Sequence, residues 1–224
     1  MDRALACRRS GRIAIGRRGR RLSGPQAGPP PTGGASAEPR HSAVRYPGGI
    51  TVRYRWVGSA QAAALFGLSE AGGELVDHGE LGAPDPDAAC RAELRAEGPG
   101  GVWTARLASP IYDEPQAVLW DVPGLLVVGY GFRTYAFDAR TGALHWWHRS
   151  GSPIVAVLAS SLLDHVIVQA EVETFALEAS GEVVWRLAHG DVVVAAELSG
   201  GQLILAAYGG EQLSLDPATG RATE

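Results

Sequence analysis

The sequence predicts an all-β fold built from groups of short strands that repeat along the chain. Gly142, Gly181 and Gly220 are separated by 39 residues each time, and Trp146 and Trp185 have the same spacing. Between these markers lie short runs rich in Val, Ile and Leu, bounded by Gly or polar residues, which is typical of buried strands rather than helices. A fixed period of this length indicates repeated units that stack on their neighbours.

Each full unit contains four expected strands. We expect strands at 116–122, 125–131, 133–139 and 143–149, at 154–160, 165–171, 173–179 and 182–188, and at 192–198, 202–208 and 211–216. Four strands on this period indicate the blades of a β-propeller, here a small one of about four blades. A degenerate unit containing Trp103 precedes the three clear ones. Its stretch 62–69 fits a short helix as well as a strand.

The hairpin between the last two strands of a unit carries a recurring set of residues. In the first clear copy these are Ala136, Asp138, Thr141, Gly142 and Trp146. We expect the Asp and Thr side chains to accept hydrogen bonds from turn amides, the Gly to supply a positive φ, and the Trp to fill the groove between blades. The later copies contain Ala176, Glu178, Gly181 and Trp185, and then Asp216, Thr219 and Gly220. Folding alone explains all of them.

This hairpin resembles the tryptophan-docking motif of pyrroloquinoline-quinone (PQQ)-type propellers, over about residues 116–224. The later copies depart from it, because Glu178 replaces the Asp and Glu224 stands where the last Trp would fall. Enzymes of that family are longer, and they bind Ca²⁺ and PQQ over the central channel, often beside two adjacent cysteines. This chain has only Cys7 and Cys90. We therefore carry over no metal ligand and no catalytic residue, and we expect no cofactor.

The stretch 50–58 reads as a strand without a blade of its own. Because the last unit ends where its outermost strand should begin, we expect 50–58 to supply that strand, close the ring and hide its open edges. The expected blades then span about 60–109, 110–152, 153–190 and 191–224. The same exchange in trans gives a strand-exchanged dimer, so the sequence leaves both monomer and dimer open.

The first 49 residues differ in composition from the rest of the chain. Residues 1–45 carry a net charge of +8, whereas the remainder carries −12. This Arg/Gly/Pro-rich segment has no apolar period, so we expect residues 1–49 to be a disordered tail. The sequence has no apolar run long enough for a secretory signal or a membrane span, which predicts a cytoplasmic protein without membrane contact.

Candidate site residues are expected at the channel mouth, where loops from several blades converge. They are Tyr112, Asp113, Glu114, Trp120, Asp121, Tyr130, Arg133 and Glu171. His145 and His148 are three positions apart on a strand and point to opposite faces, so they do not readily share a metal ion. We find no nucleophile with a base, no phosphate-binding loop and no paired metal motif, and we predict no catalytic residue.

The sequence therefore favours a non-enzymatic binding or scaffolding module with a protein partner. Two alternatives stay open. One is a sensor or enzyme that holds a small ligand at the channel mouth. The other is a nucleic-acid-associated module that acts through the Arg-rich tail, since the acidic remainder argues against a nucleic-acid surface there.

Overall fold

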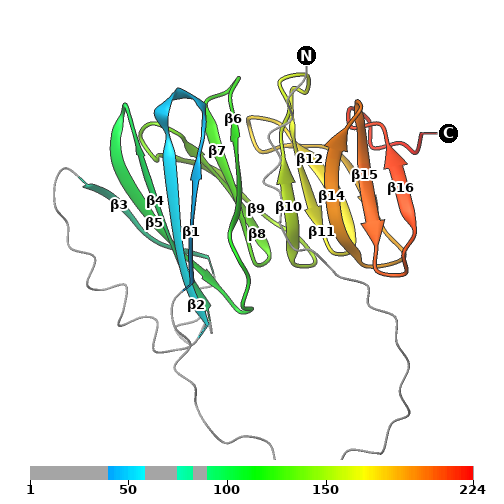
Figure 1. The fold of residues 1–224 in the computed structure, drawn as a ribbon, viewed down its shortest axis with the longest axis horizontal. Helices are drawn as coiled ribbons and strands as arrows, with labels where there is room; N and C mark the ends of the chain where they lie inside the picture. The colour runs from blue at the N-terminus through cyan, green and yellow to red at the C-terminus, as the bar shows by residue number, and fades with distance from the viewer. Residues whose placement is uncertain (1–39, 59–74, 83–89, 224) are drawn as a thin grey trace, which may run out of the picture.

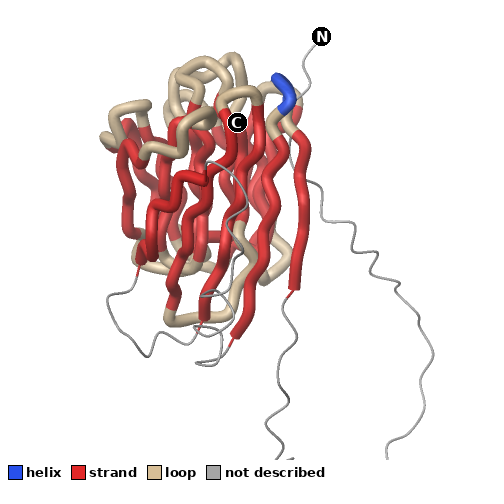
Figure 2. The backbone as a smooth tube through the Cα atoms, turned by 90° about the vertical axis from the view of Figure 1, so that its left-hand side faces the viewer, coloured by secondary structure: helices blue, strands red, loops and turns tan. Residues whose placement is uncertain are grey.

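The computed structural model describes residues 40–58, 75–82 and 90–223 of the chain. The strands in these ranges form four sheets, which stand side by side in chain order (Figure 1). The connecting turns gather at the two ends of the strands (Figure 2). The predicted all-β fold is confirmed, and each sheet has the form of a propeller blade.

The first blade is the least regular of the four. It contains β1 (Arg40–Arg45), β2 (Thr51–Gly58), β3 (Leu75–Gly82), β4 (Cys90–Gly98) and β5 (Gly101–Ser109), with the short 3-10 turn η1 (Pro47–Gly49) between β1 and β2. The spatial order is β1-β2-β4-β5-β3. All neighbours are antiparallel except β3, which runs parallel to β5 at the outer edge.

The other blades are antiparallel meanders in which consecutive strands pair. The second blade contains β6 (Gln116–Trp120), β7 (Leu125–Tyr130), β8 (Arg133–Asp138) and β9 (Leu144–Arg149). The third contains β10 (Ile154–Leu158), β11 (Val166–Ala170), β12 (Glu173–Leu177) and β13 (Val183–Ala188). The fourth contains β14 (Val193–Ser199), β15 (Gln202–Ala207) and β16 (Gln212–Leu215), followed by a single bridge between Leu215 and Ala222.

The predicted role of 50–58 is wrong. This segment is β2, and it lies between β1 and β4 in the first blade rather than beside β16 in the fourth. The physical reason is its buried face: Val52, Tyr54 and Trp56 pack into the core between the first and second blades. Closure of a ring is not shown.

The predicted boundary of the N-terminal tail is also wrong. Residues 40–45 form β1, which pairs along its whole length with β2. Tyr46 extends the contact, because its hydroxyl donates a hydrogen bond to the carbonyl of Ala117 at 3.1 Å in the second blade. Val44 packs against the core, so apolar contact offsets the entropy of ordering this segment. The stretch 62–69 lies outside the described residues.

Apolar side chains fill the spaces between blades, and the central strands contribute to both sides. In β11, Val166 and Val168 pack toward the second blade, whereas Ile167 packs toward the fourth. Every residue of β7 and of β11 is accordingly buried. This explains why these strands are almost entirely apolar, since a strand covered on both faces has no solvent side.

A tryptophan of each of the first two blades docks on the next blade, Trp103 from β5 and Trp146 from β9. Trp146 Nε1 donates a hydrogen bond to the carbonyl of Ala179 at 2.9 Å. Its ring covers Gly181, where an added Cβ would lie 2.7 Å from a ring carbon. Trp103 donates to the carbonyl of Ala139 in the same way, at 3.3 Å. Each ring therefore ties a blade to the hairpin of its neighbour.

The third contact of this kind is different. The Trp185 ring covers Gly220, but its Nε1 has no hydrogen-bond partner in the described part of the chain. The carbonyl of Pro217, which takes the place of Ala179 in this blade, accepts a hydrogen bond from His165 Nε2 at 2.9 Å. His165 and Trp185 also meet edge to face. The fourth blade is thus held by two side chains of the third.

An aspartate holds two of the hairpins that receive these rings, Asp138 in the second blade and Asp216 in the fourth. Asp138 Oδ1 accepts hydrogen bonds from the amides of Arg140 and Thr141, at 3.0 and 2.7 Å. The Thr141 hydroxyl adds another at 2.9 Å, and Gly142 has a φ of 75°. Burial pulls the pKa of Asp138 upward, but the hydrogen bonds from Thr141 outweigh it and hold the pKa below its usual value.

Replacing Trp146 by Ala should destabilise the protein by about 2–4 kcal/mol, because the change removes a packed ring and a hydrogen bond to the next blade. Trp147→Ala is the matched control. Its ring is half exposed and stacks only under Arg133, so it should cost less than about 1 kcal/mol. Urea unfolding of both variants measures the difference. Equal losses would show that docking contributes little to stability.

Candidate functional site

The turns of the molecule fall into two sets at opposite ends of the strands, as in any antiparallel meander. The turns after the first and third strands of a blade lie at one end, the motif end, which includes the hairpin of Asp138. The turns after the second strand and the connections to the next blade lie at the other end. This second set is 110–115, 131–132, 150–153, 171–172, 189–192 and 208–211. We call it the turn face.

Backbone hydrogen bonds join the turn face into one surface across the second, third and fourth blades. Each bond links the turn after a second strand with the connection that leads into or out of the next blade. In each bond a backbone amide donates to a backbone carbonyl. The pairs, with the donor first, are Ile154 and Gly131 at 2.7 Å, Glu171 and Pro153 at 2.9 Å, Val193 and Glu171 at 2.7 Å, and Tyr208 and Val192 at 2.7 Å. A surface tied in this way presents its side chains in fixed positions.

A buried polar chain connects the interior of the third blade with this face. The Thr174 hydroxyl donates to Gln169 Oε1 at 2.5 Å, and both side chains are fully buried. Since that hydroxyl hydrogen is used, His189 Nε2 is the donor in the 2.6 Å contact with Thr174 Oγ1. The His189 ring is therefore fixed with its proton on Nε2. Partial burial lowers its pKa.

The groove between the second and third blades is closed at the turn face by Arg186. The guanidinium lies over the Phe175 ring at 5.2 Å and donates to His148 Nε2 at 2.9 Å. Its Nε lies 3.6 Å from Glu173, which also accepts a hydrogen bond from the Gly151 amide at 2.7 Å. Burial and the neighbouring Arg186 lower the pKa of His148. His148 is thus a partner of Arg186.

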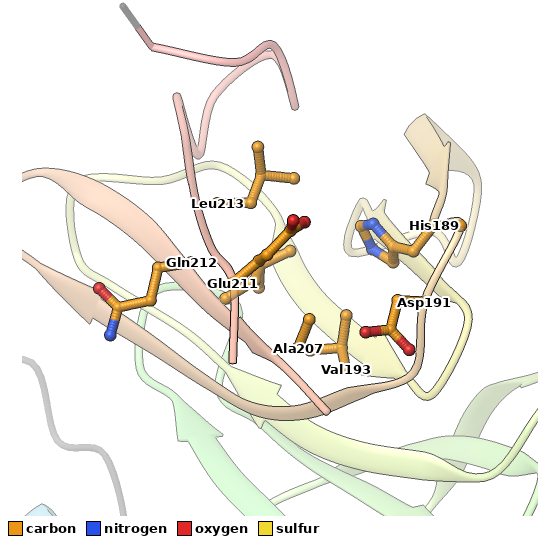
Figure 3. A pocket seen from close by; sticks show the side chains of 9 residues that line it. His189, Asp191, Val193, Ala207, Glu211, Gln212 and Leu213 are labelled. Atoms are coloured by element: carbon orange, nitrogen blue, oxygen red, sulfur yellow. The ribbon is translucent and has the colours of Figure 1, made fainter. Parts of the chain in front are cut away.

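The corresponding groove between the third and fourth blades is open and forms a hollow of about 180 Å³ (Figure 3). Val193, Leu205 and Leu213 supply apolar lining, while His189, Asp191 and Glu211 supply polar groups from both blades. Asp191 is held in place, because its carboxylate accepts hydrogen bonds from the amides of Val192 at 2.7 Å and Gly209 at 2.9 Å. The hollow combines apolar walls with two carboxylates.

Exposed large apolar side chains occur at four places on the turn face. They are Tyr112, Val172, Val192 and Tyr208, each from a different turn or connection. Tyr208 is 81% exposed, far more than a tyrosine with a packing role. The turn face is therefore a candidate interaction site.

Most of the predicted channel-mouth residues lie at this end of the strands. These are Tyr112, Asp113, Glu114, Tyr130, Arg133 and Glu171. Tyr130 is buried rather than presented to solvent, and burial raises its pKa. Arg133 lies over the Trp147 ring at 4.7 Å.

The placement of Trp120 and Asp121 near the other candidates is wrong. They end β6 and begin the turn after it, so they lie at the motif end. Successive turns of an antiparallel meander alternate between the two ends, which separates them from the turn face. Trp120 is buried in the core between the second and third blades.

Several residues of the site were not among the predicted candidates. They include Val172, His189, Asp191, Val192, Tyr208 and Glu211. The 39-residue period of the sequence predicts their positions. Once 131–132 and 171–172 are recognised as equivalent turns, the turn 208–211 follows in the last blade, and the connection 189–192 lies beside it.

Other kinds of site are not supported in the part of the chain that the structure describes. No group of three or more His, Cys, Asp or Glu side chains is placed to hold a metal ion there. Cys90 is buried, and burial raises the pKa of its thiol, which makes it a poor nucleophile. Within the same ranges, no helix has the length and apolar character needed to cross a membrane.

The four sheets define the class of the protein as a repeat protein with β-propeller blades. No protein-family model and no curated protein matches the sequence. Solved structures do match, among them BamB from Moraxella catarrhalis, at 25% identity over 59% of this chain and 41% of that one, with a TM-score of 0.44.

Two further matches are the Pan2 WD40 domain from Neurospora crassa and a europium-containing methanol dehydrogenase. The Pan2 domain is 16% identical over 49% of this chain and 36% of its own, with a TM-score of 0.43. The dehydrogenase is 15% identical over 45% of this chain and 22% of its own, with a TM-score of 0.40. The chain thus spans less than half of each of these three proteins.

Stability should depend on pH through His189. Because burial lowers its pKa in the folded protein, the unfolded chain binds this proton more readily, and stability falls as pH drops below about 6.5. His189→Gln keeps a donor for Thr174 but cannot titrate, so its stability should change less between neutral and mildly acidic pH. Urea unfolding at several pH values across this range measures how the free energy of unfolding changes with pH. An unchanged pH dependence in His189→Gln would contradict the assignment.

Proposed function

We propose that this protein is a non-enzymatic scaffold that binds a protein partner through its turn face. The observation that carries the proposal is the set of exposed apolar side chains, led by Tyr208, on a surface fixed by hydrogen bonds between blades. Protein interfaces are anchored by a few aromatic or apolar side chains in fixed positions, surrounded by a polar rim. Glu171, Asp191 and Glu211 provide such a rim here.

The size of the hollow favours a partner side chain over a small ligand. Pockets for drug-sized molecules are usually about 300–1,000 Å³. The hollow beside Tyr208 has about 180 Å³, which suits one apolar or basic side chain. Its two carboxylates favour a partner that carries positive charge at this point. A cytoplasmic location and the choice between monomer and dimer stay predictions.

A paired set of variants tests the proposal. In the full chain, Val192→Ser with Tyr208→Ser removes two exposed apolar side chains from the turn face. Val122→Ser with Leu162→Ser removes two exposed ones from the motif end, which are 76% and 69% exposed. A partner captured stoichiometrically by the unchanged protein should bind the turn-face variant roughly 30-fold more weakly, as expected for loss of an anchor. The control variant should bind normally.

Thermal unfolding of both variants controls for damage to the fold, and both should unfold near the temperature of the unchanged protein. A partner that binds both variants equally well would contradict the assignment to the turn face. If no protein is captured and a small molecule raises the unfolding temperature, the alternative of a ligand-binding sensor or enzyme is supported instead.

A further inference from the structure

The first blade has a charged face where the other blades have an apolar one. This outer face consists of the side chains of β1, β2 and β4 that point away from the second blade. Cross-strand pairing places the exposed and half-exposed ones in three rows, which are His41, Arg55 and Glu93, then Ala43, Arg53 and Arg95, then Arg45, Thr51 and Glu97. The next row on this face, Val57 and Arg91, is buried. The three rows carry four arginines and two glutamates, and therefore a positive surplus.

Equivalent positions in the later blades are apolar and buried. The second blade uses Leu126, Val128, Tyr135 and Phe137 there, the third Val166, Val168, Phe175 and Leu177, and the fourth Leu203, Leu205 and Leu215. Stacking a blade of that kind on the outer face would remove its charges from water without apolar contact in return, which is costly. The composition of the outer face thus marks it as a surface for a polar partner.

The charges of the outer face are organised around its glutamates. Glu97 lies 2.6 Å from Arg53 and 3.0 Å from Arg95, so two arginines share one carboxylate. Hydrogen bonds from Arg53 and then Arg95 lower the pKa of Glu97. Arg55 pairs with Glu93 at 3.3 Å. Half of the Arg53 side chain is still exposed, which leaves its guanidinium accessible to a second anion.

The shape and composition of the outer face indicate which kind of anion it binds. A shallow hollow of about 680 Å³ lies over His41, Arg53, Arg55 and Arg95. None of the large apolar side chains that are exposed in the described part of the chain lies on this face. A protein partner would find no apolar anchor here, whereas a phosphate backbone is bound through arginine alone.

We propose that the outer face of the first blade binds the phosphate backbone of nucleic acid without reading its sequence. The segment that leads into β1 supports this choice over an acidic protein. Residues 1–39 contain eight arginines and two acidic residues, and they lead into β1, whose first residue is Arg40. A basic N-terminal arm that continues into a basic surface is typical of nucleic-acid binding. This site is independent of the turn face.

The test measures binding of a short labelled duplex DNA to the full chain by fluorescence anisotropy, at several concentrations between roughly 50 and 200 mM salt. In the variant Arg45→Gln with Arg53→Gln, Glu97 keeps Arg95 as its partner, so the face stays paired. This variant should bind roughly tenfold more weakly and lower the slope of log affinity against log salt by about 2. The matched control is Arg140→Gln with Arg221→Gln, two exposed arginines at the motif end, which should bind as the unchanged protein does.

Three results would overturn the proposal. One is duplex binding by the Arg45/Arg53 variant with unchanged affinity and slope, which would assign binding to residues 1–39 alone. Another is the absence of duplex binding by the unchanged protein at the lowest salt. The third is tighter binding of polyglutamate than of DNA with the same dependence on Arg45 and Arg53, which would make the face a receptor for acidic protein. The Val192/Tyr208 variant should bind DNA normally, so failure of one site is distinguishable from failure of the other.

Discussion

Burial between neighbouring blades is the constraint on which the rest of this structure depends. A single four-stranded sheet has two faces, and in the second and third blades both are covered, so the central strands β7 and β11 have no solvent side. The tryptophans make this stacking specific, because Trp103 and Trp146 each reach the hairpin of the next blade. A hairpin that receives a ring must be tight and must contain a glycine beneath it. The recurring motif is therefore a consequence of stacking.

The same constraint explains how much of the fold the sequence predicts. Every strand from β6 to β16 follows from the 39-residue period and from turn chemistry, because these signals are local. The position of β2 does not follow. The alternation of Val52, Tyr54 and Trp56 with charged residues shows that this strand has one buried face, but it does not show which sheet covers that face. The partner of β2 is β4, some forty residues later, which no local pattern encodes.

The candidate site was predictable in part for a related reason. Hairpin residues such as Asp138 are committed to packing at the motif end, so binding residues are expected at the opposite end, where turns are free of that role. Tyr112 and Glu171 lie at that end of the strands, whereas Trp120 lies at the motif end because it precedes the turn after the first strand of its blade. Asp191 and Glu211 come together only through the contact of two blades, and a repeat read one unit at a time does not reveal that contact.

The two surfaces proposed here differ because the blades differ in what covers them. Apolar side chains pack against each other between blades, and the hydrogen bonds that join those blades make the turn face rigid. The outer face of the first blade replaces the same apolar positions with Arg53, Arg55 and Arg95. Glu93 and Glu97 pair with these arginines, and the three rows of the outer face still hold more arginines than glutamates. A sheet that only needed to be solvated would not require this surplus, since balanced charges or neutral polar groups serve equally well.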